Sequence, residues 1–305
     1  MRLFIASWVL VVALLPGFAH AAPALVDTAW LEERINDPGI VIVDMTGDQM
    51  QYQRFHIPEA VRLPYSTLVQ RQKNGISLRV PDQRLAALLG DLGITKEHYV
   101  VVYDDMGGLH AGRLFWELER VGHTSVSVLD GGLVKWILEG RKVINTWKQT
   151  KPVSYSLKGG KGRDNEIDHT AVKHGVALGR VKLLDVRSRE EYVGNPRTKR
   201  SGHIPGAQWW PWDASVDFEG RFERQSPAVL TASLRAVGVT HTDEPVVLYC
   251  RSGHRAAQAY LTLRSLGYDN LKLYDGSMLE YQQDRKASLQ TGTTPGEGRD
   301  ACRSC

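Results

Sequence analysis

Cysteine is scarce in this chain, with only three among its 305 residues. Three cysteines cannot build the disulfide framework that holds many small secreted domains together. Cys302 and Cys305 stand close enough in sequence to pair with each other in an oxidising compartment, which leaves Cys250 as the odd thiol. An unpaired thiol suggests a chemical role, so the residues around Cys250 are candidates for a functional site.

The chain also lacks a strong excess of either charge. Its 38 Lys and Arg residues oppose 34 Asp and Glu residues, and the basic residues are scattered rather than gathered in a stripe. We therefore expect no nucleic-acid partner. The sequence contains no cluster of metal-ligand residues and no Gly-rich nucleotide loop. With 42% hydrophobic and 24% charged residues, it has a globular composition and room for two domains.

Long apolar runs are missing except at the N-terminus. Leu3 to Phe18 is almost wholly apolar, contains Pro16, and leads into Ala19-His20-Ala21, which fits a small-x-small cleavage site. This pattern predicts a signal peptide over residues 1–21, and hence a periplasmic or secreted mature protein that meets the membrane only through that segment. An uncleaved anchor is the alternative, because the run is close to the shortest length that spans a bilayer.

After this segment, one series of elements occurs twice, with the same order and similar spacing. The matched segments are Ile40–Asp44 with Val181–Asp185, His56–Ala60 with His203–Ala207, and Val100–Asp104 with Val246–Cys250. Such a repeat indicates a duplicated domain rather than one large sheet. The buried strands alternate with helical patterns, which predicts an α/β fold of two tandem domains, each a mostly parallel sheet with helices on both faces.

The repeat sets the predicted domain boundaries. Residues 22–145 form the first domain, which has Asp104 where the second has its cysteine, and residues 166–285 form the second. Between them, residues 146–165 are polar, without apolar periodicity, and are predicted to be a linker. Residues 286–305 are polar with several Gly and Pro, which predicts a flexible tail.

Cys250 stands where a buried strand gives way to a helix, with Arg251, Ser252, Gly253, His254 and Arg255 in between. In parallel sheets, functional groups gather beyond the carboxyl ends of the strands. Helix N-termini and arginines favour thiolate over thiol, and a glycine lets backbone N–H groups turn towards an anion. We therefore predict that Cys250 is a catalytic nucleophile and that residues 251–255 bind an anionic substrate.

Three other interpretations of this loop agree less well with its residues. A cysteine at a strand end is often simply buried, but two arginines and a glycine within five residues argue against that here. A Cys–His protease pair has poor geometry, because His254 lies in the same tight loop. A phosphatase-like loop needs one residue more between its cysteine and arginine than the four found here, so the shorter loop favours a sulfur anion over phosphate.

Together, several short motifs resemble the rhodanese (thiosulfate sulfurtransferase) family in its tandem form, over about residues 25 to 285. They are Asp185-x-Arg187, Glu191-Tyr192-x-Gly194, Gly202–Ala207 and the Cys250 loop. The resemblance implies a sulfurtransferase in which Cys250 takes sulfur from a small anionic donor, becomes a persulfide, and passes the sulfur to cyanide or a thiol. It also implies that no metal or organic cofactor is needed, that the first domain is inactive, and that Asp185 and Arg187 brace the active loop.

The donor is less sharply predicted than the reaction. The loop from Cys250 to Arg255 matches neither the thiosulfate pattern nor the 3-mercaptopyruvate pattern of the family, and Glu191 stands where many tandem members carry arginine. Arg251 favours thiosulfate, since a charged loop suits a dianion. A 3-mercaptopyruvate sulfurtransferase and a non-catalytic persulfide carrier that delivers to a partner protein remain alternatives. The sequence predicts no oligomeric state.

Cys302 and Cys305 form a lone CxxC at the C-terminus. Without a thioredoxin-like context this pattern is a weak redox signal. It is either an incidental disulfide or a dithiol that accepts sulfur from Cys250.

Overall fold

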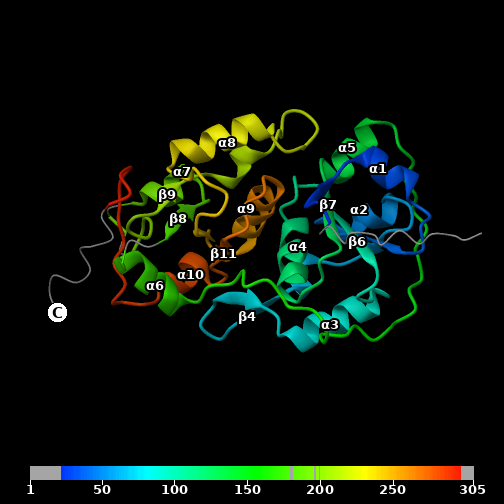
Figure 1. Cartoon of the computed structure of the whole chain (residues 1–305), viewed down its shortest axis with the longest axis horizontal. Coiled ribbons are helices and arrows are strands. Elements are labelled where there is room, and N and C mark those ends of the chain that lie inside the picture. Colours follow the sequence, from blue (N-terminus) through cyan, green and yellow to red (C-terminus); the bar gives the residue numbers. More distant parts are fainter. Residues whose placement is uncertain (1–21, 179–180, 196, 199, 297–305) are drawn as a thin grey trace, which may run out of the picture.

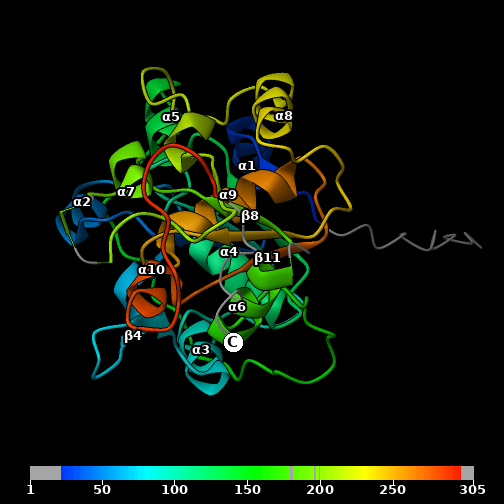
Figure 2. The same ribbon diagram turned by 90° about the vertical axis from the view of Figure 1, so that its left-hand side faces the viewer.

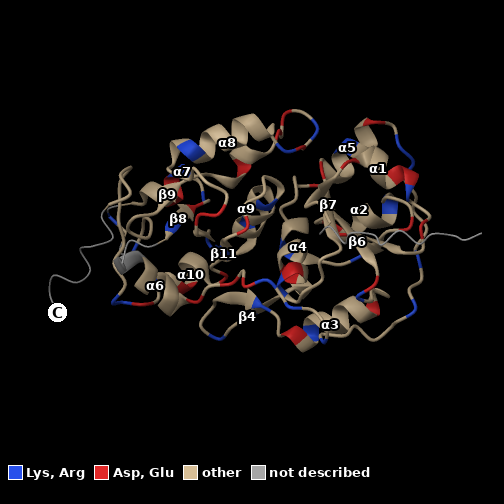
Figure 3. Cartoon of the chain, viewed as in Figure 1, with Lys and Arg blue, Asp and Glu red and all other residues tan. Residues whose placement is uncertain are grey.

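The computed structural model describes residues 22–178, 181–195, 197–198 and 200–296. The predicted signal peptide and the cysteines of the predicted tail lie outside these ranges. The described residues form two α/β domains that lie side by side, with helices α4 (Ala111–Arg120) and α9 (His254–Ser265) between their sheets (Figure 1). Lys, Arg, Asp and Glu residues are interspersed over both domains (Figure 3), as their scatter along the sequence indicates.

Domain one is built on a five-stranded parallel sheet in the order β1-β7-β6-β2-β3. Its strands are β1 (Leu25–Val26), β2 (Ile40–Asp44), β3 (Val61–Arg62), β6 (Tyr99–Tyr103) and β7 (Val126–Leu129), and its other helices are α1 (Thr28–Glu33), α2 (Gln49–Arg54), α3 (Asp82–Asp91) and α5 (Gly132–Leu138). Successive strand residues point to opposite faces. Val100 and Val102 pack with α3 and α4, whereas Val101 and Tyr103 pack with α1 and α5. A small antiparallel sheet is formed by β4 (Val69–Arg71) and β5 (Ser77–Arg79), which follow the 3-10 turn Tyr65–Thr67.

Domain two repeats this architecture with a four-stranded parallel sheet in the order β11-β10-β8-β9. Its strands are β8 (Lys182–Asp185), β9 (Gln208–Trp209), β10 (Val246–Tyr249) and β11 (Leu271–Leu273), and its other helices are α6 (His169–Leu178), α7 (Arg189–Val193), α8 (Pro227–Ala236) and α10 (Ser277–Tyr281), with a 3-10 turn at Trp212–Ser215. Leu248 packs with α8 and α9, and Tyr249 packs with α6 and α10. The predicted fold class is confirmed.

The repeat extends to individual hydrogen bonds. In domain one the Tyr103 hydroxyl donates to Asp44 and accepts the N–H of Ile57. In domain two the Tyr249 hydroxyl donates to Asp185 at 2.8 Å and accepts the N–H of Ile204 at 3.2 Å. Each tyrosine hydroxyl therefore joins the end of its own strand to the end of the neighbouring strand. It also binds the segment that leads into the next strand of the sheet, β3 in domain one and β9 in domain two. The strand that ends at Cys250 is therefore fixed by a tyrosine directly before the cysteine.

The two domains share one hydrophobic core across α4 and α9. A side chain at Gly112 of α4 would place its Cβ 2.9 Å from the carbonyl oxygen of Ala257, so glycine lets the helices approach closely. Glu119 at the end of α4 accepts hydrogen bonds from Tyr260 and Arg264 of α9. The interface is consequently close-packed, and side chains of domain one can contact domain two.

The segment predicted as a flexible tail differs from that prediction over its described part. Gln290 exchanges two backbone hydrogen bonds with His203, Gly206 donates to the carbonyl of Pro295, and Ala287 is buried. Figure 2 shows this segment, in red, between α7 and α10 on the face of domain two turned towards the viewer. The repeat explains the pairing, because Ile144 exchanges the same two bonds with His56 in domain one.

The predicted linker, residues 146–165, contains neither helix nor strand and runs along domain one. Val153 donates its N–H to the carbonyl of Gly90, and Asn165 is buried with its amide against the carbonyl of Trp116. Within the described ranges, no helix combines the length and the apolar character needed to cross a bilayer.

Candidate active site

Cys250 follows β10 directly and lies at the carboxyl edge of the domain-two sheet, as predicted. Its thiol is unpaired and its side chain has no exposed surface. Helix α9 begins four residues later, after Gly253 with φ = 78°. The sulfur therefore belongs to a short loop that ends at a helix N-terminus, where backbone dipoles favour a negative charge.

The backbone N–H groups of this loop fall into two sets. Those of Cys250 and Gly253 both donate to the hydroxyl oxygen of Ser277, each at 3.1 Å. The second set comprises the backbone N–H groups of Arg251, Ser252, His254 and Arg255. Within the described part of the chain, none of these four has a hydrogen-bond acceptor in range. The second set is available to an anion on or beside the sulfur, as expected for a backbone nest.

The corresponding loop of domain one shows what such N–H groups bind. The Asp104 carboxylate accepts four of them within its own loop, at 2.7 to 3.0 Å, from Met106, Gly108, His110 and Ala111. An anion thus occupies the cradle of domain one as part of the chain itself. A carboxylate cannot carry sulfur, so the prediction of an inactive first domain has a structural basis.

We expect Asp104→Ala to lower the free energy of unfolding by about 3 kcal/mol, because two buried and two part-buried N–H groups lose their acceptor. Asp104→Asn keeps one acceptor oxygen and should lose less. Denaturant unfolding measures both variants. Asp105→Ala is the matched control, since Asp105 accepts a single bond, from Gly47 at 3.3 Å. Equal losses at the two positions would contradict this account of Asp104.

Arg255 makes a two-pronged ion pair with Glu191, at 2.6 and 2.9 Å. Although its burial opposes the charge, Glu191 and Cys250 raise the pKa of Arg255. Burial likewise acts against the Glu191 carboxylate, but Arg255 holds its pKa below the usual range. Arg255 was predicted to contact the substrate, whereas its guanidinium is engaged by Glu191. Arg251 is exposed and is the loop arginine whose charge faces solvent.

Asp185 and Arg187 form the predicted salt bridge, with Nη2 2.5 Å from Oδ2. Arg187 also donates to the carbonyl of Gly202 at 2.8 Å, and Asp185 accepts the Tyr249 hydroxyl. The pair therefore braces the strand end before Cys250 rather than the loop after it. Burial opposes the charge on Arg187, but Asp185 raises its pKa.

His254 turns its ring towards domain one. It stacks on Tyr65 with ring centroids 3.9 Å apart and on His110 at 5.0 Å. Burial, followed by His110 and Arg113, lowers the pKa of His254 to about 3. A ring of such low basicity is a poor general base, which agrees with our argument against a Cys–His pair. Its backbone N–H remains part of the loop.

Sequence reasoning missed four residues of this site. Ser277 and Asp275 lie in a loop after β11 to which we assigned no role. Arg113 and Tyr65 come from domain one, and no local signal marks them. Their importance depends on which surfaces of the two domains meet.

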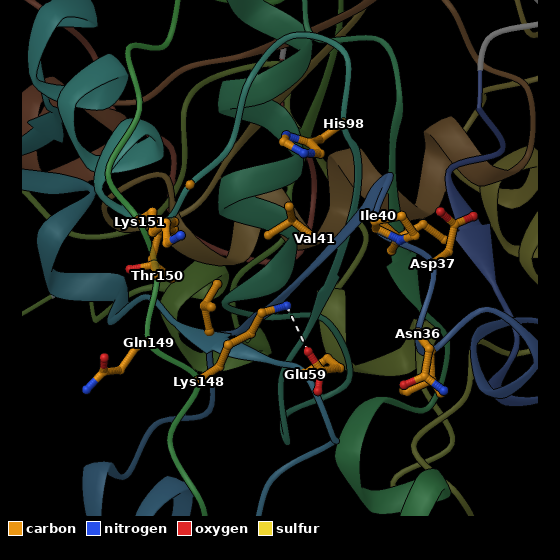
Figure 4. Close-up of a pocket in the computed structure, with 15 residues that line it drawn as sticks. Asn36, Asp37, Ile40, Val41, Glu59, His98, Lys148, Gln149, Thr150 and Lys151 are labelled. Carbon is orange, nitrogen blue, oxygen red and sulfur yellow. Dashed lines mark ion pairs between the residues drawn. The ribbon is translucent and has the colours of Figure 1, made fainter.

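Three cavities of about 260 to 480 Å³ lie elsewhere, and none of these three is lined by Cys250. The one in Figure 4, of about 450 Å³, lies at the start of β2, between the sheet and the linker. Lys148 and Glu59 form a 3.0 Å ion pair across it. This is the edge of the sheet opposite Asp104. In the described residues, no group of three or more His, Cys, Asp or Glu side chains is placed to bind a metal ion.

The model of the rhodanese-like domain matches residues 27–139 and 168–284. A sulfur carrier protein TtuD of Thermus thermophilus is 32% identical over 282 residues, covering 87% of this chain and 95% of its own. A thiosulfate sulfurtransferase of Azotobacter vinelandii is 31% identical over 267 residues, covering 85% of this chain and 94% of its own.

Solved structures share the fold at lower identity. YnjE is 21% identical with a TM-score of 0.76, covering 90% of this chain and 70% of its own, and wild-type EanB is 20% identical with a TM-score of 0.77, covering 89% and 70%. Both domains of the chain match the family model, and relatives of 30% identity or more cover most of its length. The chain therefore belongs to the rhodanese family, as a sulfurtransferase built from two tandem rhodanese-like domains.

Proposed function

We propose that this protein is an exported sulfurtransferase that takes a sulfur atom from thiosulfate onto Cys250 and passes it to cyanide or a thiol. One observation carries the proposal: the buried Cys250 sits in a loop whose free N–H groups resemble those that bind a carboxylate in domain one. A sulfur anion attached to Cys250 would meet the same kind of cradle.

The reaction takes two displacement steps. The Cys250 thiolate attacks the outer sulfur of thiosulfate, a sulfur–sulfur bond forms to the cysteine, and sulfite leaves with the electron pair of the broken bond. Cyanide then attacks the terminal sulfur of the persulfide, thiocyanate leaves, and the thiolate is restored. The free N–H groups of Arg251, Ser252, His254 and Arg255 stabilise the negative charge on sulfur in the thiolate and in the persulfide.

Thiosulfate is supported by Arg251, whose exposed charge suits a dianion, and by the activity for which the Azotobacter relative is named. The engagement of Arg255 by Glu191 favours the main alternative, 3-mercaptopyruvate, because one free loop arginine suits a single carboxylate. The second alternative is a non-catalytic carrier, as the name of the Thermus relative suggests for that protein.

A comparison of donors tests the proposal. The mature protein should release thiocyanate from cyanide faster with thiosulfate than with 3-mercaptopyruvate, each at a saturating concentration. Faster turnover with 3-mercaptopyruvate would refute thiosulfate as the preferred donor and identify 3-mercaptopyruvate instead. No turnover with either donor, combined with a gain of one sulfur atom on Cys250, would favour the carrier.

Export is supported by the N-terminal pattern and by the start of the folded domain. Within the described residues the first paired strand begins at Leu25, so cleavage after Ala21 keeps all the described strands of domain one. The protein recovered from a periplasmic or culture fraction should begin at Ala22 by mass spectrometry. A chain that keeps Met1 and stays with the membrane would instead support the anchor.

A further inference from the structure

A second loop, Asp275-Gly276-Ser277, lies directly against the Cys250 loop. Ser277 adopts a left-handed backbone, with φ = 50°, and its hydroxyl accepts the N–H groups of Cys250 and Gly253 while donating to the carbonyl of Tyr274 at 2.7 Å. The backbone N–H of Met278 also donates to the carbonyl of Cys250 at 3.2 Å. The two loops therefore form one unit, and the position of the second fixes that of the first.

The second loop is held from domain one. Arg113 of α4 is fully buried and donates to both carboxylate oxygens of Asp275, at 2.5 and 3.2 Å. Asp275 accepts a further bond, at 2.6 Å, from the backbone N–H of Arg79. A Cβ atom at Gly253 would lie 3.0 Å from Nη1 of Arg113. The guanidinium thus lies against the catalytic loop itself, although it comes from the domain without a thiol.

The charge of Arg113 matters as well as its position. A carboxylate beside the loop would disfavour a second negative charge on the Cys250 sulfur, and Arg113 offsets it. Arg113 stays charged, because Asp275 and Glu117 raise its pKa against the opposing effect of burial. The pair ends a chain of alternating charges across the interface: Glu166, Arg79, Asp82, Arg120, Glu117, Arg113 and Asp275.

We propose that Arg113 is a positioning residue for sulfur transfer, through which the inactive domain holds and charge-balances the catalytic loop. The inference rests on the proposed role of Cys250 as the nucleophile. It gives domain one a part in the reaction. Without Arg113, the Cys250 loop loses its support, and the Asp275 carboxylate lies beside the thiol with its charge uncompensated.

The test compares Arg113→Met, Arg113→Lys and the double variant Arg113→Met with Asp275→Asn, all in a background of Cys302→Ser and Cys305→Ser so that Cys250 is the only thiol. The ultraviolet absorbance of the thiolate against pH gives the pKa of Cys250, and the thiosulfate–cyanide assay gives kcat and KM. Arg264→Met is the matched control, because Arg264 also forms an interdomain pair, a part-buried one with Glu119 at 2.9 Å, away from the Cys250 loop.

Arg113→Met should raise the pKa of the Cys250 thiol by about one unit, which below that pKa lowers the thiolate fraction about tenfold. We expect kcat to fall at least tenfold with little change in KM. Arg113→Lys should retain part of the activity, since it keeps the charge but not the paired donors. Asp275→Asn in the Met background should return the thiol pKa towards wild type, because it removes the uncompensated charge. Arg264→Met should lower stability but leave the thiol pKa and kcat unchanged.

Folded Arg113→Met protein with the wild-type thiol pKa and kcat would overturn the proposal. Equal losses of activity in Arg264→Met would also overturn it, since the effect would then belong to domain docking in general. If Arg113→Met fails to fold, a wild-type kcat in Arg113→Lys has the same force, because that variant loses the paired donors to Asp275. The thiol pKa is measured without a sulfur donor, so a wild-type protein inactive with thiosulfate would refute the donor and leave the test of Arg113 in place.

Discussion

Replacing Cys250 with serine is expected to abolish sulfur transfer, with a loss of kcat of at least about a thousandfold, as for removal of other catalytic nucleophiles. A serine hydroxyl is far less acidic than a thiol and forms no persulfide. Because serine is close to cysteine in size, the buried site should keep its packing and the variant its fold. Thiocyanate formation under saturating thiosulfate and cyanide measures the loss.

The matched control for this change is the pair Cys302→Ser and Cys305→Ser. These thiols are not needed when cyanide is the acceptor, so the control should keep wild-type turnover. Turnover that survives in Cys250→Ser, or that disappears in the control, would place the nucleophile in the CxxC and refute the assignment of Cys250.

Gly253→Ala is expected to lower kcat about a hundredfold, the size of effect that a displacement of about 1 Å produces at an active site. Gly253 has φ = 78°, and an added Cβ would lie 2.9 Å from the carbonyl oxygen of Asp275 and closer still to its carboxylate. The loop can relieve this contact only by moving away from Asp275 and Ser277. The loop N–H groups that have no acceptor in the described structure move with it.

Gly267→Ala separates this displacement from the cost of the backbone angle. Gly267 follows α9 with φ = 85°, and an added Cβ there would meet nothing within 4 Å. Both substitutions should lower stability by about 1–2 kcal/mol, the cost of a left-handed backbone with a side chain. Only Gly253→Ala should lose activity, and a comparable loss in Gly267→Ala would refute the role of the Gly253–Asp275 contact.

The sequence was sufficient to predict the fold and the location of the Cys250 loop, because both depend on local patterns. Buried strands are continuous apolar runs, and the edge at which Cys250 and Asp104 lie follows from the strand–helix order alone. The sequence repeat also predicted that Asp104 and Cys250 occupy equivalent positions in the two domains. The structure then explains the equivalence, since the carboxylate of one loop fills the kind of cradle that the other presents to sulfur.

The contacts around the loop could not be predicted, because they join distant parts of the chain. Arg113 and Asp275 are 162 residues apart, and Arg255 and Glu191 are 64 apart. Nothing near Arg255 in the sequence indicates that a carboxylate engages its guanidinium. His254 likewise looked like a substrate-binding loop residue, and only the docking of Tyr65 shows that its ring packs against domain one.

The described part of the tail was missed for another reason. Residues after Lys286 are polar, and polarity alone predicts a solvated segment. Their stability comes from backbone bonds to His203 and Gly206, which leave no mark in side-chain composition. The structure shows the pairing twice, since Gln290 pairs with His203 as Ile144 pairs with His56.

The central claim is that Cys250 carries sulfur as a persulfide, and peptide mass spectrometry tests it most directly. The wild-type protein is incubated with thiosulfate, its free thiols are blocked, and it is digested and analysed without reductant. The account predicts a gain of one sulfur atom on the peptide that contains Cys250, reversed by cyanide and absent in Cys250→Ser. An unmodified Cys250 peptide, or added sulfur confined to Cys302 and Cys305, would contradict it.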